Sequence, residues 1–450
     1  MRFMPMIASP LHEVWAYFDF FSVPYRITDP TFEDFITGGE DGLDATSPPR
    51  WNPSAAGKVA VGTLWDYLGF PSVEPSLNPV AWPQYAYNMI YNKHYRVTAL
   101  QAEVPLTNED LLLGNWELDY FTGNLPWQQR GVAPALPVTG ASVALWDAAE
   151  VVNGAPASPI NATFEGTGVN TSMYVNNAQA RSNAWEYMND NTVDLSLATT
   201  FDIADLREAI QIQRFLELNA RAGSRLNEFL RGQFNIAPID KTLQEPEFIG
   251  RCKLPVMMDE VAQTSAPAVG APLGQVAGKG IAVGNENVGS VRIEEPGLVM
   301  GIMCVKPKPA YQQGINRAWL IQSKYDYPFP VFANLSEQET MVGEIYADGV
   351  ADDATFGGFT GRYDEYRIMQ DSVHGLLKQT VAGYSHWHMG RIFAAQPALN
   401  GSFLQCDCSA IKARIMAVPA EPTFIANVGN IVSVTRALPL YANPSLMEKI

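Results

Sequence analysis

The sequence predicts a mainly β protein in which short strands are separated by many turns and a few helices. Its 35 glycines and 32 prolines recur between short apolar runs and are not pooled in one linker. Because Gly and Pro interrupt regular structure, this distribution favours a loop-rich β fold over a helical bundle. Aromatic and β-branched residues, which suit a pleated sheet, dominate several of the runs. Length does not fix the domain count, since large β folds can exceed the usual domain of about 150 residues.

Three runs are the clearest strand predictions. Residues 13–27, EVWAYFDFFSVPYRI, are aromatic and β-branched up to Pro24, which closes the run. GLVMGIMCV at 297–305 and NIVSVTRALPLYA at 430–442 have the same character and lie near turns.

Helical periodicity occurs in one long segment, DIADLREAIQIQRFLELNA. The three-and-four spacing of one helix face is followed there by Leu206, Ala209, Ile210, Gln213, Leu216 and Ala220. We expect Asp202 to cap this helix and Gly223 to end it. A second, short helix is expected in SRLNEFLRG, between Ser224 and Gly232. Amphipathic helices of this kind usually pack against a core, so both are expected to lie on the sheet.

Several segments are expected to be insertions or loops. Residues 134–200 are rich in Ala, Asn, Gly, Ser and Thr and poor in aromatic residues, which predicts a long insertion. Residues 266–290 form a second small-residue stretch, expected to be a long loop. Within it, GQVAGKG at 274–280 misses the spacing and the final Ser or Thr of a phosphate-binding loop. The acidic segments 38–44 and 347–355 do not have EF-hand spacing and are expected to be solvated turns.

The charge balance limits the possible partners. The chain has 30 Lys and Arg against 47 Asp and Glu, a net charge of −17, which disfavours non-specific attraction to phosphate backbones. Only 17% of its residues are charged, compared with about 25% in a typical protein. Much of the surface must therefore be covered by uncharged groups or by other chains.

The sequence gives no sign of export or of a membrane span. The N-terminal segment is interrupted by Pro5, Pro10 and Asp19, so it lacks the apolar stretch of a signal peptide. No run of about 18 apolar residues occurs. The four cysteines are too few for a disulfide framework and are expected to be reduced.

A weak catalytic hypothesis concerns residues 115–131, NWELDYFTGNLPWQQRG. Trp116, Tyr120 and Trp127 could stack a sugar while Glu117 or Asp119 acts as the acid, as in a carbohydrate-active β-sandwich enzyme. Aromatic residues of this kind are also common in protein interfaces, and two carboxylates this close in sequence are frequent. A secreted lectin-like module is a further alternative, which the missing signal peptide disfavours.

A metal site is a second weak hypothesis. His386 and His388 are two residues apart, as are Cys406 and Cys408, so each pair would point to one face of a strand. A site with two histidines and two cysteines is conceivable, but structural zinc sites usually show tighter cysteine signatures. Satisfied histidines and buried thiols are the simpler expectation. No G-x-S-x-G, H-E-x-x-H or G-x-G-x-x-G motif supports an enzyme.

Six sequence blocks, in order, resemble the major capsid protein of the Microviridae, most closely the gokushovirus-like branch. They are LHEVWAYFDFFSVPYRITDPTFEDFITGG (11–39), YAYNMIYNKHYR (85–96), DYFTGNLPWQQRG (119–131), QIQRFLELNARAGSRLNEFLRGQF (211–234), PEFIGRCKLPVMMDEVAQTSA (246–266) and YQQGINRAW (311–319). The third block departs from the family pattern at Gln128, where the family has proline, and at Arg130, where it has lysine. The C-terminal third of the chain matches loosely.

The resemblance implies an eight-stranded antiparallel viral jelly roll with long inter-strand insertions. Copies would assemble into a T=1 icosahedral shell around the circular single-stranded DNA of a small bacteriophage. The partners it implies are other copies, the encapsidated DNA, a small basic DNA-packaging protein, an internal scaffolding protein, a DNA pilot protein and a host cell-surface receptor. It implies no catalysis and no cofactor or metal, and it implies assembly in the bacterial host cytoplasm and residence in the virion.

The same resemblance suggests how the chain is divided. Residues 1–133 would form the N-terminal part of the jelly-roll core, and residues 134–200 a variable insertion that forms a protrusion at the threefold axis. Residues 201–235 would be a helical insertion packed on the core. Residues 236–450 would complete the core and end in a C-terminal arm. The segment 115–131 is then expected to be scaffold and intersubunit surface.

Overall fold

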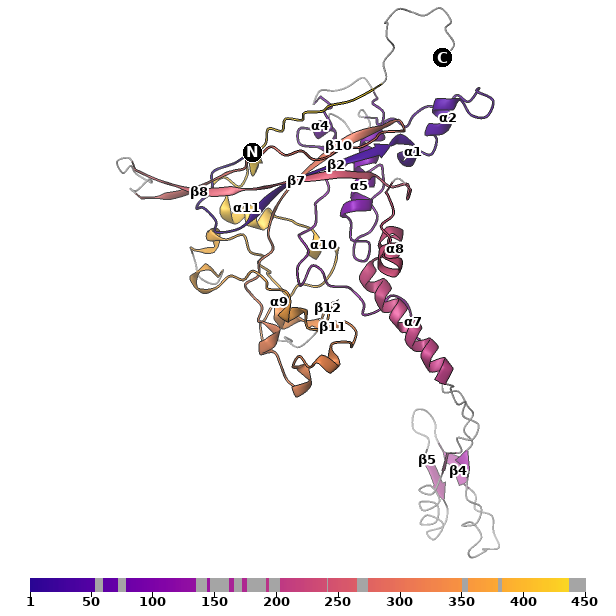
Figure 1. Cartoon of the computed structure of the whole chain (residues 1–450). Helices are drawn as coiled ribbons and strands as arrows, with labels where there is room; N and C mark the ends of the chain where they lie inside the picture. Colours follow the sequence, from indigo (N-terminus) through magenta and orange to yellow (C-terminus); the bar gives the residue numbers. More distant parts are fainter. Residues whose placement is uncertain are drawn as a thin grey trace, which may run out of the picture. The chain divides into compact units, whose positions relative to one another are not determined.

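A computed structural model of the chain describes most of it outside the predicted insertion (Figure 1). The described residues are 1–52, 60–71, 78–134, 203–240, 242–264, 274–349, 355–378 and 383–436, with the backbone of four short strands between 144 and 193. The chain divides into two compact units. The first comprises Met1–Gln128 and Asn219–Ile450, and the second comprises Gln129–Leu218.

Three long antiparallel strands form the central sheet of the first unit. In order across the sheet they are β10 (Gly297–Pro307), β2 (Val14–Pro24) and β7 (Glu247–Pro255). Figure 1 shows them side by side, with β2 in the middle. The strands predicted at 13–27 and 297–305 are therefore confirmed. β2 ends at Pro24, which has no backbone N–H to continue the ladder.

A second antiparallel sheet contains a strand that the sequence did not predict. In order its members are β13 (Phe424–Ile425), β1 (Arg2–Phe3), β9 (Val276–Ile281) and β8 (Met257–Ala262). The prediction of a long loop over 266–290 is wrong where β9 lies. A Cβ on Gly278 would be 2.2 Å from the carbonyl oxygen of Ala8, and one on Gly280 would be 3.0 Å from the ring of Phe3. These glycines allow the N-terminal segment to approach the strand closely.

Shorter elements complete the first unit. One antiparallel hairpin pairs β11 (Gln338–Met341) with β12 (Thr355–Thr360). The helices before the insertion are α1 (Tyr25–Thr28), α2 (Phe32–Thr37), α4 (Leu64–Tyr67), α5 (Trp82–Ile90) and the π-helix η1 (Tyr91–Tyr95). The later ones are α9 (Val342–Ile345), α10 (Gly401–Leu404), α11 (Ser409–Ile415) and the 3₁₀ turns η3 (Arg317–Trp319), η4 (Lys324–Asp326), η5 (Pro330–Phe332), η6 (Asp364–Tyr366), η7 (Gly375–Leu377) and η8 (Ser385–Trp387).

Both predicted helices after the insertion are confirmed in position. They are α7 (Ile203–Ala222) and α8 (Leu226–Phe234). Gly223 separates them with a φ of 113°, a left-handed value that favours glycine. Only Ala220 of α7 is buried, and no residue of α8 is, so the packing of these helices on the core stays a prediction. No helix in the described part of the chain is long and apolar enough to cross a bilayer.

Two other predictions have different outcomes. The insertion predicted at 134–200 lies almost entirely outside the described residues, as does Asp202, the predicted helix cap. Two short antiparallel ladders are described there, β3 (Ala144–Leu145) with β6 (Thr192–Val193) and β4 (Ala162–Glu165) with β5 (Ser172–Val175).

The strand predicted at 430–442 is wrong over its described part, residues 430–436, which are irregular. Ile431 is 96% exposed there, and no neighbouring segment among the described residues pairs with this stretch. An apolar, β-branched run needs a partner strand to become part of a sheet. The remainder of the prediction, 437–442, lies outside the described residues.

The core joins the two ends of the chain. One apolar cluster contains Met6, Val14, Trp116, Val256, Ala282, Met389, Cys406, Ile411, Ile415 and Met416. A second contains Tyr120, Phe121, Tyr311, Val342, Ile345, Phe356, Phe403 and Leu404. In a third, smaller cluster, α5 packs against β2 and β10. In a fourth, the rings of Trp51 and Trp65 stack on each other. The two sheets and the helices described above confirm the expectation of antiparallel sheets with a few helices.

Candidate functional site

The segment 115–131 is fixed to the C-terminal third of the chain at two points. At its start, the Trp116 N–H donates to the Leu404 carbonyl at 2.9 Å, and the Cys406 N–H donates to the Gly114 carbonyl at 2.8 Å. Further along, Leu125 and Phe359 exchange two backbone hydrogen bonds of 2.8 and 2.7 Å. The segment therefore links distant parts of the sequence.

Most aromatic rings of this segment are buried in the core. Trp116 and Tyr120 are each 5% exposed and Phe121 is 2% exposed. The Phe121 ring meets the rings of Tyr120 and Tyr311 edge-on, with centroids 5.2 and 4.8 Å apart. Such edge-to-face pairs add about 0.5–1.5 kcal/mol beyond the burial of area. The expected scaffold role of the segment is confirmed for these rings, whereas Trp127 is only half-buried.

The two carboxylates of the segment have separate structural partners. Glu117 accepts a hydrogen bond from the Tyr17 hydroxyl and pairs with Lys253 at 3.3 Å. Asp119 accepts from the backbone N–H of Phe121 at 2.9 Å and from the Tyr311 hydroxyl at 2.7 Å. Each carboxylate is therefore used within the fold.

This arrangement contradicts the enzyme alternative. Burial on its own raises the pKa of Glu117, but the hydrogen bonds from the Tyr17 hydroxyl and the Lys253 ammonium hold that pKa below its usual range. A glycosidase acid needs the opposite shift, so that the carboxyl group is protonated near neutral pH. Trp116 and Tyr120 face the core and leave no open platform for a sugar.

A buried carboxylate joins the central sheet to the helix beside it. Asp19 on β2 is 2% exposed. It receives two hydrogen bonds from Arg251 on β7, of 2.5 and 2.8 Å, and one of 2.6 Å from the Tyr95 hydroxyl in η1. Burial, followed by the nearby Asp19, raises the pKa of Tyr95 well above its usual value, so the hydroxyl remains a donor. Burying a charge is tolerated here because it is fully paired.

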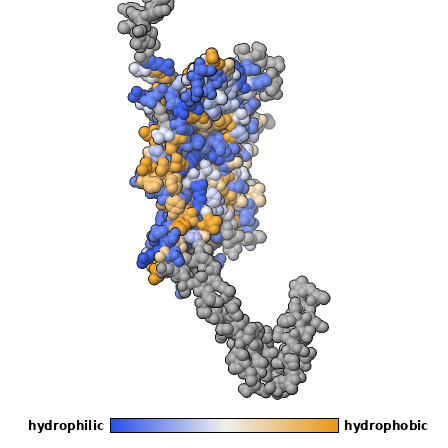
Figure 2. All heavy atoms as spheres, turned by 90° about the vertical axis from the view of Figure 1, so that its right-hand side faces the viewer, coloured by the Kyte–Doolittle hydropathy of each residue, from blue (hydrophilic) through white to orange (hydrophobic). Residues whose placement is uncertain are grey.

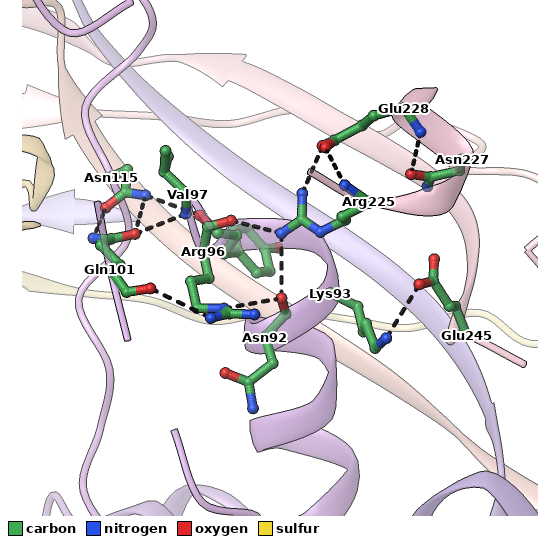
Figure 3. A network of polar contacts seen from close by, with 11 residues as sticks. Asn92, Lys93, Arg96, Val97, Gln101, Asn115, Arg225, Asn227, Glu228 and Glu245 are labelled. Atoms are coloured by element: carbon green, nitrogen blue, oxygen red, sulfur yellow. Dashed lines mark hydrogen bonds and ion pairs between the residues drawn. The ribbon is translucent and has the colours of Figure 1, made fainter. Parts of the chain in front are cut away.

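Beside this group, a polar network brings together two of the six sequence blocks, 85–96 and 211–234, and the start of the aromatic segment 115–131 (Figure 3). The guanidinium of Arg225 in the turn before α8 donates to the carbonyls of Asn92 and Arg96, at 3.2 and 2.6 Å. These carbonyls lie at the C-terminal end of η1, where helical carbonyls lack partners within the helix. Arg225 is held in place by Glu228, at 2.9 Å. One arginine therefore satisfies a helix end and attaches α8 to the core.

The same network continues into the aromatic segment. Asn115 donates to the Tyr95 carbonyl at 2.9 Å, and Gln101 donates to the side-chain oxygen of Asn115 at 2.8 Å. Figure 3 shows Gln101 and Asn115 on one side of Arg96 and Arg225 on the other. No local sequence signal predicted these contacts, because their partners lie far apart in the chain.

The predicted histidine and cysteine pairs do not form a metal site. No group of three or more His, Cys, Asp and Glu side chains in the described parts of the chain is arranged to hold a metal ion. His388 is 3% exposed, and its Nδ1 accepts a hydrogen bond from the Gly390 N–H at 3.1 Å. The guanidinium of Arg414 donates to the His388 carbonyl at 3.0 Å, so a positive charge is already present beside this histidine.

The cysteines and His386 are accommodated without a metal. The Sγ atoms of Cys406 and Cys408 are 3.5 Å apart. This hydrogen bond, together with burial, raises the pKa of the Cys406 thiol, and all four cysteines are unpaired, as the sequence predicted. His386 lies half-buried in η8 against Trp387, with ring centroids 5.8 Å apart.

Replacement of the arginine at the centre of the network should destabilise the protein. Arg225→Ala removes the donor of the Arg96 carbonyl and leaves the Asn92 carbonyl with only the long 3.5 Å hydrogen bond from Arg96 Nε, at a cost of about 1–3 kcal/mol in the free energy of unfolding. Urea unfolding of the purified protein measures this cost. Arg292→Ala is the matched control, because its side chain is 88% exposed and pairs with Glu294 on the surface. Equal unfolding midpoints for the two variants would show that the network contributes nothing.

Acid should weaken the fold through His388. Burial, followed by the charge of Arg414, lowers the pKa of His388 from 6.5 to about 4. The unfolded chain therefore takes up this proton first, so the stabilisation is complete above pH 6.5 and is lost as the pH falls towards 4.

We expect His388→Asn, which keeps an acceptor for the Gly390 N–H, to show a shallower loss of unfolding free energy over that interval. The exposed His374 supplies the control substitution, His374→Asn, which should leave the slope unchanged. A wild-type slope in the His388 variant would contradict the assignment. Unfolding free energies measured by urea titration at each pH provide the comparison.

The family model and the three relatives that match this chain are all described as capsid proteins. The model of a family described as "Capsid protein (F protein)" matches residues 1–446. The capsid protein VP1 of Bdellovibrio phage phiMH2K is 28% identical over 475 residues, covering 99% of this chain and 88% of its own. The VP1 proteins of Chlamydia phage 1 and Spiroplasma virus 4 are also 28% identical, each over 95% of this chain and over 86% and 84% of their own lengths.

The buried rings of Trp116, Tyr120 and Phe121 and the paired carboxylates of Glu117 and Asp119 are used within the fold, as is expected of a structural protein. The resemblance to Microviridae capsid proteins, expected from the sequence blocks, is confirmed by the match over nearly the whole length. The chain belongs to the phage capsid protein (F protein) family and is a structural protein of the virion, not an enzyme.

Proposed function

We propose that this chain is the shell subunit of a small bacteriophage, and that its copies form a T=1 icosahedral capsid around circular single-stranded DNA. The observation that carries the proposal is the agreement with capsid proteins along almost the entire chain, from residue 1 to residue 446. Antiparallel sheets of four and three strands support an eight-stranded jelly roll as the fold of the subunit. The divisions expected at residues 1–133, 201–235 and 236–450 belong to the same proposal.

The surface of the subunit is consistent with coverage by neighbouring copies. Figure 2 shows hydrophobic side chains in patches among hydrophilic ones on the face it presents. Large apolar residues such as Met369 (97% exposed), Val283 (85%) and Val331 (81%) are open in the single chain. Patches of this kind on a soluble protein usually mark interaction surfaces.

The charge of the subunit bears on how the DNA is packaged. With a net charge of −17, the shell supplies few cations to offset the phosphates. Charge compensation would then come from counterions and from a small basic packaging protein. An internal scaffolding protein and a DNA pilot protein complete the set of partners that we propose for assembly in the bacterial cytoplasm.

We also propose that roughly residues 138–195 project outward and contact a receptor on the host surface. Support comes from the ladder between β3 and β6, where Leu145 is paired with Thr192. Because these two residues lie opposite each other, the chain leaves and returns at one place. Such an excursion can be shortened without separating the strands that flank it.

Shortening the insertion tests the proposed function. Replacing residues 146–191 by Asn-Gly closes the β3–β6 pair with a two-residue turn. We expect particles with nuclease-protected single-stranded DNA at wild-type yield and a loss of adsorption to host cells. A Gly/Ser segment of the original length is the control for spacing and should also abolish adsorption.

The measurements are particle yield by sedimentation, DNA content after nuclease treatment, and adsorption of purified particles. Loss of particles in the shortened variant would show that the insertion is architectural. Unchanged adsorption would show that it has no host role. Absence of protected single-stranded DNA from wild-type particles would contradict the proposed cargo.

A further inference from the structure

An aromatic face lies on the first unit between η3 and β11. We define this 319–335 face by five exposed large side chains of the segment: Trp319, Tyr325, Tyr327, Phe329 and Val331. Their exposed fractions are 77%, 57%, 53%, 47% and 81%, respectively. Exposed single apolar residues are ordinary, but five within thirteen positions form a patch.

The backbone of the 319–335 face is held in place by its own hydrogen bonds. In η4, the Ser323 side chain caps the Tyr325 N–H at 3.2 Å, and Asp326 accepts from the Ser323 N–H at 2.7 Å. The Tyr363 hydroxyl lies 3.3 Å from the Tyr327 carbonyl, to which it donates. The exposed rings therefore project from fixed turns, which lowers the entropy lost when a partner covers them.

Packing between rings adds to this order. The inward-facing Phe332 meets both Tyr325 and Phe329 edge-on, with centroids 6.1 Å apart in each case. The guanidinium of Arg362 lies 5.9 Å from the Phe332 centroid. Tyr325 and Phe329 are thus joined through Phe332, and the Arg362 guanidinium lies near the same ring.

The open area is large enough for a subunit contact. An aromatic side chain spans about 150–250 Å², so four rings near half exposure leave roughly 400–600 Å² open, as much as the largest patch of a typical monomer. Stable interfaces bury about 800 Å² per partner. Val331 and Leu335, which are 81% and 52% exposed, add further apolar area from the same segment.

The charges around this face favour a protein partner over DNA. Arg317 pairs with Glu344 at 2.9 Å, and Arg367 pairs with Asp364 at 2.7 Å. Single-strand binding surfaces combine stacking aromatic residues with an excess of positive charge along the backbone path. Two further cations, Lys324 and Arg362, lie over the rings of Tyr325 and Phe332, at 5.0 and 5.9 Å. The exposed carboxylates of Asp326 and Glu339 equal them in number, so the 319–335 face carries no excess of positive charge.

We propose that a second copy of this chain covers the 319–335 face in the assembled shell. The inference rests on the proposed function, because it assigns one of the contacts that a shell requires. Aromatic rings in fixed turns supply the desolvated centre of such an interface, where a few large side chains carry most of the binding free energy.

Charge placed on the face tests the proposal. Trp319→Lys and Val331→Glu alter side chains that are 77% and 81% exposed, so the fold of the free subunit should be retained. Each should lower particle yield at least about tenfold, since an unpaired charge at a buried interface weakens binding by more than the 1.4 kcal/mol that a factor of ten represents. Leu43→Lys, at an 82% exposed position in the acidic turn, is the matched control and should assemble normally.

Sedimentation, circular dichroism and DNA content separate the outcomes. Wild-type particle yield from both charged variants would overturn the proposal while leaving the shell function intact. Normal particles with less DNA would overturn it in favour of a nucleic-acid contact. Failure of the wild-type chain to form particles with its genomic neighbours would instead remove the proposed function itself.

Hydroxyl-radical footprinting of wild-type protein gives a test that does not depend on the variants folding. We expect oxidation of Trp319 and Tyr325 to fall at least about fivefold from free subunit to particle, because interface centres exclude water. Tyr67, which is 73% exposed outside the 319–335 face, provides an internal reference. Equal oxidation of Trp319 in both states would contradict coverage by a neighbouring copy.

Discussion

The buried carboxylate of Asp19 is the interaction on which the arrangement of the central sheet depends. It lies in the middle strand and is paired at once with Arg251 on the next strand and with Tyr95 in η1. Removing either partner would leave this buried carboxylate short of a hydrogen-bond donor, so the middle strand, its neighbour and η1 stabilise one another in the folded protein. η1 in turn receives Arg225 from the turn before α8 and Asn115 from the aromatic segment. Segments that are far apart in the sequence therefore all contact η1.

A second constraint concerns the outside of the subunit. With 17% charged residues, the chain cannot surround its core with charge, and apolar side chains remain open on strands, turns and helices. In α7, Ile203, Ile210 and Phe215 are 67%, 44% and 46% exposed. An isolated enzyme of this composition would risk aggregation, whereas a capsid protein can cover such surface with other copies. The apolar surface that folding leaves exposed can therefore be buried when copies of the chain assemble.

Patterns of neighbouring residues were enough to predict the strands and helices whose formation depends mainly on their own sequence. The aromatic run of β2, the apolar run of β10 and the periodicity of α7 and α8 were sufficient to place those elements. β9 was missed because its glycines lower strand propensity, although they are needed where the N-terminal segment approaches. The strand predicted near residue 430 failed for the opposite reason: suitable side chains had no partner in the described chain. The separate roles of Glu117 and Asp119 depend on Tyr17, Lys253 and Tyr311, distant residues that no spacing rule identifies.

The most direct test of the central claim, that this chain is a shell subunit, is its state of assembly. Negative-stain electron microscopy and sedimentation should be applied to the protein produced alone and produced together with the neighbouring genes of its genome. We expect uniform icosahedral particles in the co-produced sample at least. Only monomers or small oligomers in both samples would contradict the claim, and the open apolar surface would then need a different partner.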